Sequence, residues 1–277
     1  TYTLTSSAGC TNSITATVTI NPVLVPSVSI VTSANSICNN GTSVTFTATP
    51  TNGGTTPVYQ WKKNGVNVGT NGTTYTLTTL VNGDVITCVM TSNALCNSAT
   101  SVTSNAITET VNDLPTVNIN PALTAQNLCQ NATATSYSIS VSAGSGTVSN
   151  YKWYSNASNS NSGGTLVATN TSALTTNTYT PSTSVTGGLY YYCVVTNSNG
   201  CIATSTPSGL VTVVASPTIT TTGTINTLAV SSSNQSATLP YTATTISPTS
   251  YSIDWDATAN ASGLADQGNT SFAFAAG

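Results

Sequence analysis

The sequence repeats itself, and each repeat is marked by a tryptophan between cysteines. Cys38 lies 23 residues before Trp61, and Cys129 lies 24 residues before Trp153. Each of these two tryptophans is followed by two cysteines spaced by eight residues, namely Cys88 with Cys96 and Cys193 with Cys201. Because self-similarity of this kind is typical of arrays of like domains, we expect tandem copies of one fold.

The tryptophans lie in short segments of alternating character: VYQWKKNG at 58–65, NYKWYSN at 150–156 and YSIDWDA at 251–257. An aromatic residue stands two positions before the first two tryptophans, and Ile253 takes that place in the third. Period-two spacing puts such residues on one face of a strand, so we expect them to be buried and Lys62, Lys152 and Asp254 to face water. The predicted structural core residues are Trp61, Trp153, Trp255, Phe46, Tyr59, Tyr151, Tyr191, Cys88 and Cys193.

Proline-marked strand ends divide the chain into four parts. We expect the last strands of a domain at 1–21, whole domains at 22–112 and 113–215, and the front part of another domain at 216–277. Each whole domain holds about seven short strands, and the Asn-Gly pairs at 64–65 and 199–200 predict two-residue hairpin turns. The fold class predicted is all-β: tandem immunoglobulin-like antiparallel β-sandwiches in a linear array.

The composition excludes several classes of function. Only 3% of the 277 residues are charged, there is no histidine, and the basic residues number three. Such a chain cannot build the basic face that a nucleic-acid-binding protein needs, and it lacks the histidine of Ser-His-Asp or Cys-His catalysis. No apolar run approaches the ~20 residues of a membrane helix. We therefore expect a protein that is not an enzyme, has no cofactor and does not insert into membranes.

The segment GGLYYYCVVTNSNG, at 187–200, resembles the sixth strand of an immunoglobulin-type domain, with Tyr191 at the position of the conserved corner tyrosine. Together with the YKWY segment and GGTLVATN, it resembles more specifically the Ig-like and PKD-like repeats of large secreted surface proteins of Bacteroidetes-type bacteria, including gliding and adhesion proteins. The resemblance implies an extracellular, cell-surface location. The chain departs from the immunoglobulin pattern because Phe46 or Tyr137 occupies the position of the second-strand cysteine, and Ile86 replaces the corner tyrosine in the first whole domain.

The seven cysteines divide into two groups. Cys88 and Cys193 lie in mid-strand opposite Phe46 and Tyr137, so we expect them to be buried free thiols. The disulfide candidates are Cys38, Cys96, Cys129, Cys201 and Cys10.

Two disulfide patterns are open at this stage. Pairs within a domain, Cys38 with Cys96 and Cys129 with Cys201, require the stretch before the second strand to run back along the last strand. A strictly immunoglobulin-like topology instead brings Cys38 near Cys201, in the next domain.

Candidates for a ligand site are few. Asp254, Asp256 and Asp266 are weak candidates for calcium ligands, since carboxylates are the ligands that this ion prefers. Tyr190 and Tyr192 face away from Cys193 and could stack on sugars if exposed, although such tyrosines more often cover a sheet.

Two functions of different classes remain. The first is a non-catalytic structural repeat segment of an extracellular filament or adhesin stalk, whose partner is the protein itself in a head-to-tail array. The second is a glycan- or surface-binding Ig-like module. The two ends of the sequence are complementary parts of one domain, so the chain is either a window on a long covalent array or a subunit whose front completes the back of the next by donor-strand addition.

Overall fold

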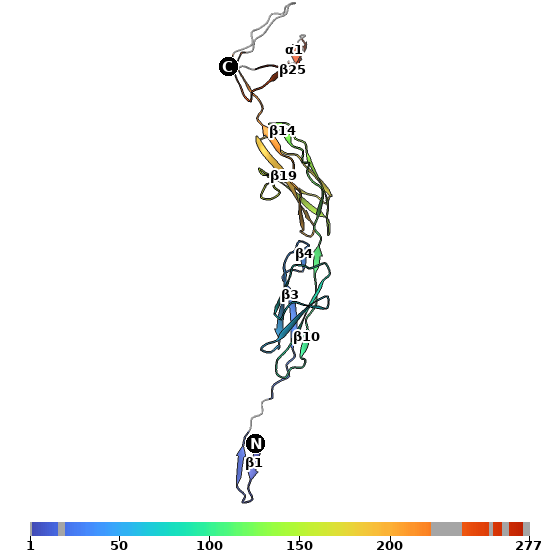
Figure 1. Ribbon diagram of the computed structural model, residues 1–277, viewed down its shortest axis with the longest axis vertical. Helices are drawn as coiled ribbons and strands as arrows, with labels where there is room; N and C mark the ends of the chain where they lie inside the picture. Colours follow the sequence, from blue (N-terminus) through green and yellow to red (C-terminus); the bar gives the residue numbers. More distant parts are fainter. Residues whose placement is uncertain (1, 16–19, 223–239, 255–256, 262–265, 274–277) are drawn as a thin grey trace, which may run out of the picture. The chain divides into compact units, whose positions relative to one another are not determined.

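The computed structural model describes residues 2–15, 20–222, 240–254, 257–261 and 266–273 (Figure 1). The chain divides into two compact units. The first comprises 1–116 together with 142–149 and 196–203, and the second comprises 117–141, 150–195 and 204–277. Trp255 and Asp256 lie outside the described residues.

A two-stranded hairpin opens the first unit. Strands β1 (Tyr2–Thr5) and β2 (Thr11–Ile14) pair antiparallel, with Tyr2 opposite Ile14 and Thr5 opposite Thr11. Every residue of both strands is exposed.

Residues 24–112 form two facing sheets. The first sheet has the order β3-β5-β8, and the second has the order β10-β9-β6-β7, with β11 also paired to β9. The strands are β3 (Ser27–Thr32), β5 (Val44–Thr51), β6 (Val58–Lys63), β7 (Val66–Val68), β8 (Thr74–Leu77), β9 (Val85–Thr91), β10 (Ser101–Thr103) and β11 (Ile107–Thr108).

Two further strands of this region pair in parallel. Strand β4 (Ser36–Cys38) runs alongside β12 (Thr110–Asn112), with Ile37 opposite Val111 and Cys38 opposite Asn112. A short strand before the second main strand that pairs in parallel with the last strand is an immunoglobulin-type arrangement.

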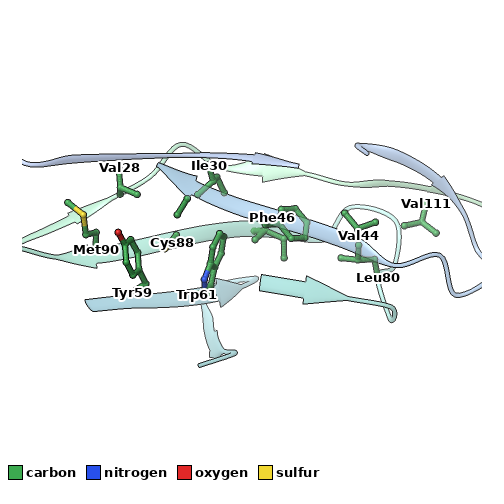
Figure 2. Packing of buried hydrophobic residues seen from close by; sticks show 12 residues of the cluster. Val28, Ile30, Val44, Phe46, Tyr59, Trp61, Leu80, Cys88, Met90 and Val111 are labelled. Atoms are coloured by element: carbon green, nitrogen blue, oxygen red, sulfur yellow. The ribbon is translucent and has the colours of Figure 1, made fainter. Parts of the chain in front are cut away.

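The core lies between the two sheets, as Figure 2 shows for the side chains of β3, β5, β6 and β9. Trp61 is fully buried, stacks on Tyr75 with ring centroids 5.8 Å apart, and contacts Phe46 at 6.4 Å. Its indole nitrogen donates to the carbonyl oxygen of Gly72 at 3.0 Å, so the one polar atom of the side chain is bonded. Tyr59 and Cys88 are also buried in this cluster.

Residues 116–214 repeat the arrangement. One sheet has the order β13-β15-β18, and the other has the order β14-β21-β19-β16-β17, with β20 also paired to β19. The strands are β13 (Thr116–Ile119), β14 (Gln126–Cys129), β15 (Tyr137–Ser142), β16 (Val148–Asn156), β17 (Thr165–Thr171), β18 (Thr176–Tyr179), β19 (Gly187–Asn197), β20 (Ile202–Thr204) and β21 (Val211–Val214).

Trp153 anchors the second core as Trp61 anchors the first. It stacks on Tyr179 with ring centroids 5.4 Å apart, and its indole nitrogen donates to Asn177 Oδ1 at 2.8 Å. Tyr191 contacts Tyr179 and Tyr137, with centroid distances of 5.5 and 6.1 Å. The other large side chains buried there include Tyr151, Ile139, Val195 and Val211.

The described parts of 216–277 form two small antiparallel pairs of strands and a short helix. They are β22 (Ile219–Thr221) with β23 (Tyr241–Thr244), β24 (Ser250–Ile253) with β25 (Gln267–Ser271), and α1 (Ala257–Ala261). The helix is absent from the sequence-based expectation, which placed strands throughout. In the described part of the chain, no helix is long and apolar enough to cross a membrane.

Candidate functional site: a disulfide-anchored turn

The structure holds one disulfide among the seven cysteines, and it joins Cys38 to Cys201. Their Cα atoms lie 5.6 Å apart although 163 residues separate them in sequence. Both residues belong to the first compact unit, because that unit includes the turn 196–203. The disulfide therefore fastens the β19–β20 turn to the end of strand β4.

The direction of β4 explains why Cys38 does not pair with Cys96. That pairing required the stretch before β5 to run back along the last strand of the domain. Strand β4 does lie beside the last strand, but in parallel with it, so Cys38 ends next to Asn112 and not at the β9–β10 turn. Neither Cys38–Cys96 nor Cys129–Cys201 is formed.

Asn197 organises the turn that carries Cys201. Its side chain is 1% exposed, and its amide nitrogen lies 3.0 Å from the carbonyl oxygens of Ala143 and Ser145 and 3.3 Å from that of Asp113. Its Oδ1 accepts hydrogen bonds from the backbone N–H groups of Asn199, at 3.1 Å, and Cys201, at 2.9 Å. A buried amide is stabilising only when its donors and acceptors are all bonded, and this one meets that condition.

Two further asparagines extend the network to strand β12. Asn199 donates from its side chain to Asn112 Oδ1 at 2.9 Å and to the Ser145 carbonyl at 3.0 Å. Asn112 in turn donates to Ser36 Oγ at 3.1 Å and to the Ile37 carbonyl at 3.2 Å. Strand β4, strand β12 and the turns 142–149 and 196–203 are thus joined by side-chain amides as well as by the disulfide.

Glycine is required at position 144 of this site. Gly144 has a φ of +68°, and a Cβ there would lie 2.3 Å from the carbonyl oxygen of Leu114. A side chain at that position would therefore force the backbone of 113–114 away from the turn.

The predicted two-residue turn at 199–200 is wrong. Asn197 N–H donates to the Cys201 carbonyl at 2.9 Å, and Gly200 N–H donates to the Asn197 carbonyl at 3.0 Å, so the loop has three residues. Gly200 has a φ of +81°, as a three-residue loop that ends in a left-handed residue requires. At 64–65, by contrast, both Asn64 (+51°) and Gly65 (+80°) have positive φ, and the tight turn is present.

Cys88 and Cys193 are buried free thiols. Burial raises the pKa of Cys88 to about 11 and that of Cys193 to about 12. A reactive cysteine needs thiolate at neutral pH, and these two remain protonated. Each is also held by a serine that sequence analysis missed: Ser104 Oγ and Ser205 Oγ accept the backbone N–H of Cys88 and Cys193, both at 2.9 Å.

Two acidic residues are buried in the first unit. Asp84 bonds to Lys63 Nζ at 2.6 Å and to Val81 N at 2.9 Å. Burial acts to raise the pKa of Asp84, but these bonds and that from Asn64 outweigh it and hold the pKa below its ordinary value. Glu109 is 1% exposed, and burial raises the pKa of its carboxyl group.

Two of the three candidate calcium ligands lie among the described residues. Asp254 and Asp266 are exposed, and Asp256 lies outside the described residues. Among the residues that the structure describes, no three His, Cys, Asp or Glu side chains are placed to hold a metal ion.

The tyrosines of β19 differ from one another. Tyr192 is buried: it stacks on Tyr154 at 5.2 Å, and its hydroxyl oxygen accepts the N–H of Gly164 at 3.1 Å. Tyr190 is half-buried. Tyr192 therefore covers the sheet and offers no ring to a sugar.

No family model matches the sequence, and no curated protein matches it. Solved structures with partial likeness include fibronectin(III)-like modules of Clostridium thermocellum CbhA, at 13% identity and a TM-score of 0.38, with 67% of this chain and 94% of that chain covered. Domains A168–A170 of titin cover 66% of this chain and 57% of theirs, at 14% identity and a TM-score of 0.30. The match to the Ig1-2 module of the Drosophila receptor protein tyrosine phosphatase DLAR covers 68% of this chain and 98% of that chain, at 16% identity and a TM-score of 0.25. These likenesses are too weak to carry an argument, and the immunoglobulin-type arrangement rests on the strand pairing above.

Proposed function

We propose that this chain is a non-catalytic structural repeat segment of an extracellular filament or adhesin stalk, built from tandem immunoglobulin-like sandwiches. The observation that carries the proposal is the Cys38–Cys201 disulfide together with the bonded Asn197 beneath it. A covalent bond and a satisfied buried amide at the same turn fasten the β19–β20 turn within the first compact unit. Such an arrangement suits a protein that bears load.

The disulfide also supports the extracellular location. Disulfides persist in oxidising compartments and are rare where glutathione and thioredoxin keep thiols reduced. The repeats resemble those of secreted surface proteins of Bacteroidetes-type bacteria, and a cell-surface location fits that resemblance.

The composition supports self-association as the mode of action. With 3% charged residues and a net charge of −3, the surface has little electrostatic self-repulsion. We infer that the partner of the chain is another copy of the same repeat, arranged head to tail. The glycan-binding alternative loses support, since Tyr192, one of its two candidate residues, is buried.

Electron microscopy of the native material tests the proposal. Antibody or gold labelling should place the protein in filaments or stalks outside the cell, and deletion of 113–215 should abolish them. A protein found dispersed in the cytoplasm, or one that binds a glycan array with high affinity while forming no filament, would contradict it.

A further inference from the structure

We propose that the β1–β2 hairpin of one copy adds to strand β24 in a second copy, and that Cys10 of this hairpin forms a disulfide with Cys129 of the second copy. The inference rests on the proposed function and supplies the linkage between successive subunits.

The turn that holds Cys10 has the same hydrogen bonds as the turn that holds Cys201. Ser6 N–H donates to the Cys10 carbonyl at 2.8 Å, Gly9 N–H donates to the Ser6 carbonyl at 2.9 Å, and Cys10 N–H donates to Ser6 Oγ at 3.2 Å. In the bonded turn, the corresponding distances are 2.9, 3.0 and 2.9 Å, with Asn197 and Gly200 in the equivalent places. Gly9 has a φ of +78° and Gly200 a φ of +81°.

Cys129 occupies the position of Cys38. Each is the last residue of a short strand that pairs in parallel with the last strand of its repeat, β14 with β21 and β4 with β12. The next residue donates its N–H across to the paired strand in both cases, Asn39 to Asn112 at 2.8 Å and Gln130 to Val214 at 2.7 Å. Cys10 thus repeats the position of Cys201, and Cys129 repeats that of Cys38. Both Cys10 and Cys129 are exposed and free.

Cys96 does not match the turn position. It follows Leu95 and not a glycine, it has a φ of +59°, and its carbonyl accepts the N–H of Leu24 at 2.9 Å. Of the two remaining exposed turn cysteines, Cys10 is therefore the one whose geometry matches that of Cys201.

The hairpin exposes a face that the equivalent hairpin buries. Leu4 and Tyr2 lie six and eight residues before Cys10, as Val195 and Cys193 lie before Cys201. Val195 and Cys193 are fully buried, whereas Leu4 is 75% and Tyr2 73% exposed. Apolar residues in alternate positions on an exposed strand mark a surface that another strand or sheet covers.

Among the described residues, strand β24 has one paired neighbour where its counterparts have two. Strand β6 has β9 on one side and β7 on the other, and β16 has β19 and β17. Strand β24, which forms the first part of the third tryptophan segment, pairs with β25 alone in the described part of the chain. Because β1 corresponds to β9 and β19, its addition to β24 would complete the pattern by strand addition.

A bond between two copies repeats the order of the bonded pair, in which the strand-end cysteine Cys38 precedes the turn cysteine Cys201. Within the 277 residues Cys10 comes before Cys129, whereas Cys129 of one copy followed by Cys10 of the next copy gives the order of the bonded pair. When the bond forms, the two thiols give up two protons and two electrons to a small disulfide such as oxidised glutathione, which is reduced to two thiols.

Non-reducing electrophoresis of the oxidised 277-residue chain tests the linkage. We expect a ladder at multiples of 27.9 kDa that collapses to the single mass on reduction. Cys10→Ser and Cys129→Ser should each abolish the ladder, and Leu4→Asp should slow its formation several-fold. Cys96→Ser, the matched exposed cysteine, should leave the ladder unchanged.

Peptide mapping of a mixture of isotopically heavy and light chains identifies the bond. A Cys10–Cys129 peptide pair of mixed isotope content supports the proposal. A pair of uniform isotope content, a ladder abolished by Cys96→Ser, or a chain that stays monomeric in oxidant would overturn it. Filaments in the native material without this bond would refute the linkage and leave the proposed function standing, whereas a ladder without native filaments would refute the function.

Discussion

The side-chain amide of Asn199 donates a hydrogen bond of 2.9 Å to the side-chain oxygen of Asn112, 87 residues earlier in the chain. Asn112 uses its own amide group on Ser36 and Ile37 of strand β4. The two asparagines thus connect the turn at 196–203 to both strands of the parallel pair that carries Cys38. Polar contacts and the disulfide therefore converge on the same turn.

Replacement of Asn197 by Ala should destabilise the chain by about 3 kcal/mol, because buried carbonyl and N–H groups lose their partners. Urea denaturation followed by tryptophan fluorescence measures the change. Asn199→Ala, at an exposed position with two hydrogen bonds, should cost about 1 kcal/mol. Equal costs for the two variants would mean that Asn197 does not organise the turn.

Replacement of Trp61 or Trp153 by Ala should cost ~3–5 kcal/mol each, since both rings are almost fully buried and stacked on a tyrosine. Calorimetry on the two variants checks this expectation. Val66→Ala, at an exposed strand position, serves as the control and should change stability by less than about 0.5 kcal/mol. A small loss at either tryptophan would remove it as an anchor of the core.

Glu109 should make the stability of the chain fall as pH rises. Its pKa is raised in the folded state by burial, so the folded chain binds the proton more tightly than the unfolded chain does. Stability is then lost as pH rises from the ordinary pKa of 4.5 through the higher pKa that Glu109 has in the folded chain. Glu109→Gln should therefore be nearly neutral at about pH 4 and stabilising at about pH 8.

Asp84 provides the matched contrast in this pH series. Its pKa is lowered in the folded state, because the bonds from Lys63, Val81 and Asn64 outweigh burial. The contribution of Asp84 to folding stability is present above its ordinary pKa of 3.8 and is lost as pH falls through its lower pKa in the folded chain. Asp84→Asn should thus destabilise at neutral pH, and a variant as stable as the parent there would contradict this assignment.

The sequence could predict the layers of the fold and not the way in which they are fastened. Alternation around Trp61 and Trp153 was enough to indicate the sheets and their buried faces, because period two decides which side chains meet. The parallel direction of β4 depends on a strand of three residues that shows no periodicity, and the choice of partner for Cys38 followed from that direction. The roles of Asn112, Asn197 and Asn199 were hidden, since Asn is common throughout the chain and marks turns in general.

The helix α1 escaped prediction for a related reason. Five residues, ATANA, are too few for an apolar periodicity to emerge. Tyr75 and Tyr179, which stack on the two tryptophans, did carry a signal: each lies between two threonines in a short strand, at the same place in its repeat.

Cys88 and Cys193 should resist alkylation in the folded chain. Burial holds their pKa at about 11 and about 12, so the nucleophilic thiolate is scarce at pH values near 8. After mild reduction, iodoacetamide should label the exposed Cys10, Cys96 and Cys129 first, as peptide mass spectrometry can show. Rapid labelling of Cys193 in the folded chain would mean that strand β19 does not bury it.

A non-reducing peptide map of the oxidised chain, digested under acidic conditions that prevent disulfide exchange, tests the disulfide-anchored turn directly. We expect a peptide pair that joins Cys38 to Cys201, with Cys88 and Cys193 recovered as free thiols. A pair that joins Cys38 to Cys96, or Cys38 recovered as a free thiol, would contradict the disulfide-anchored turn on which the structural role rests.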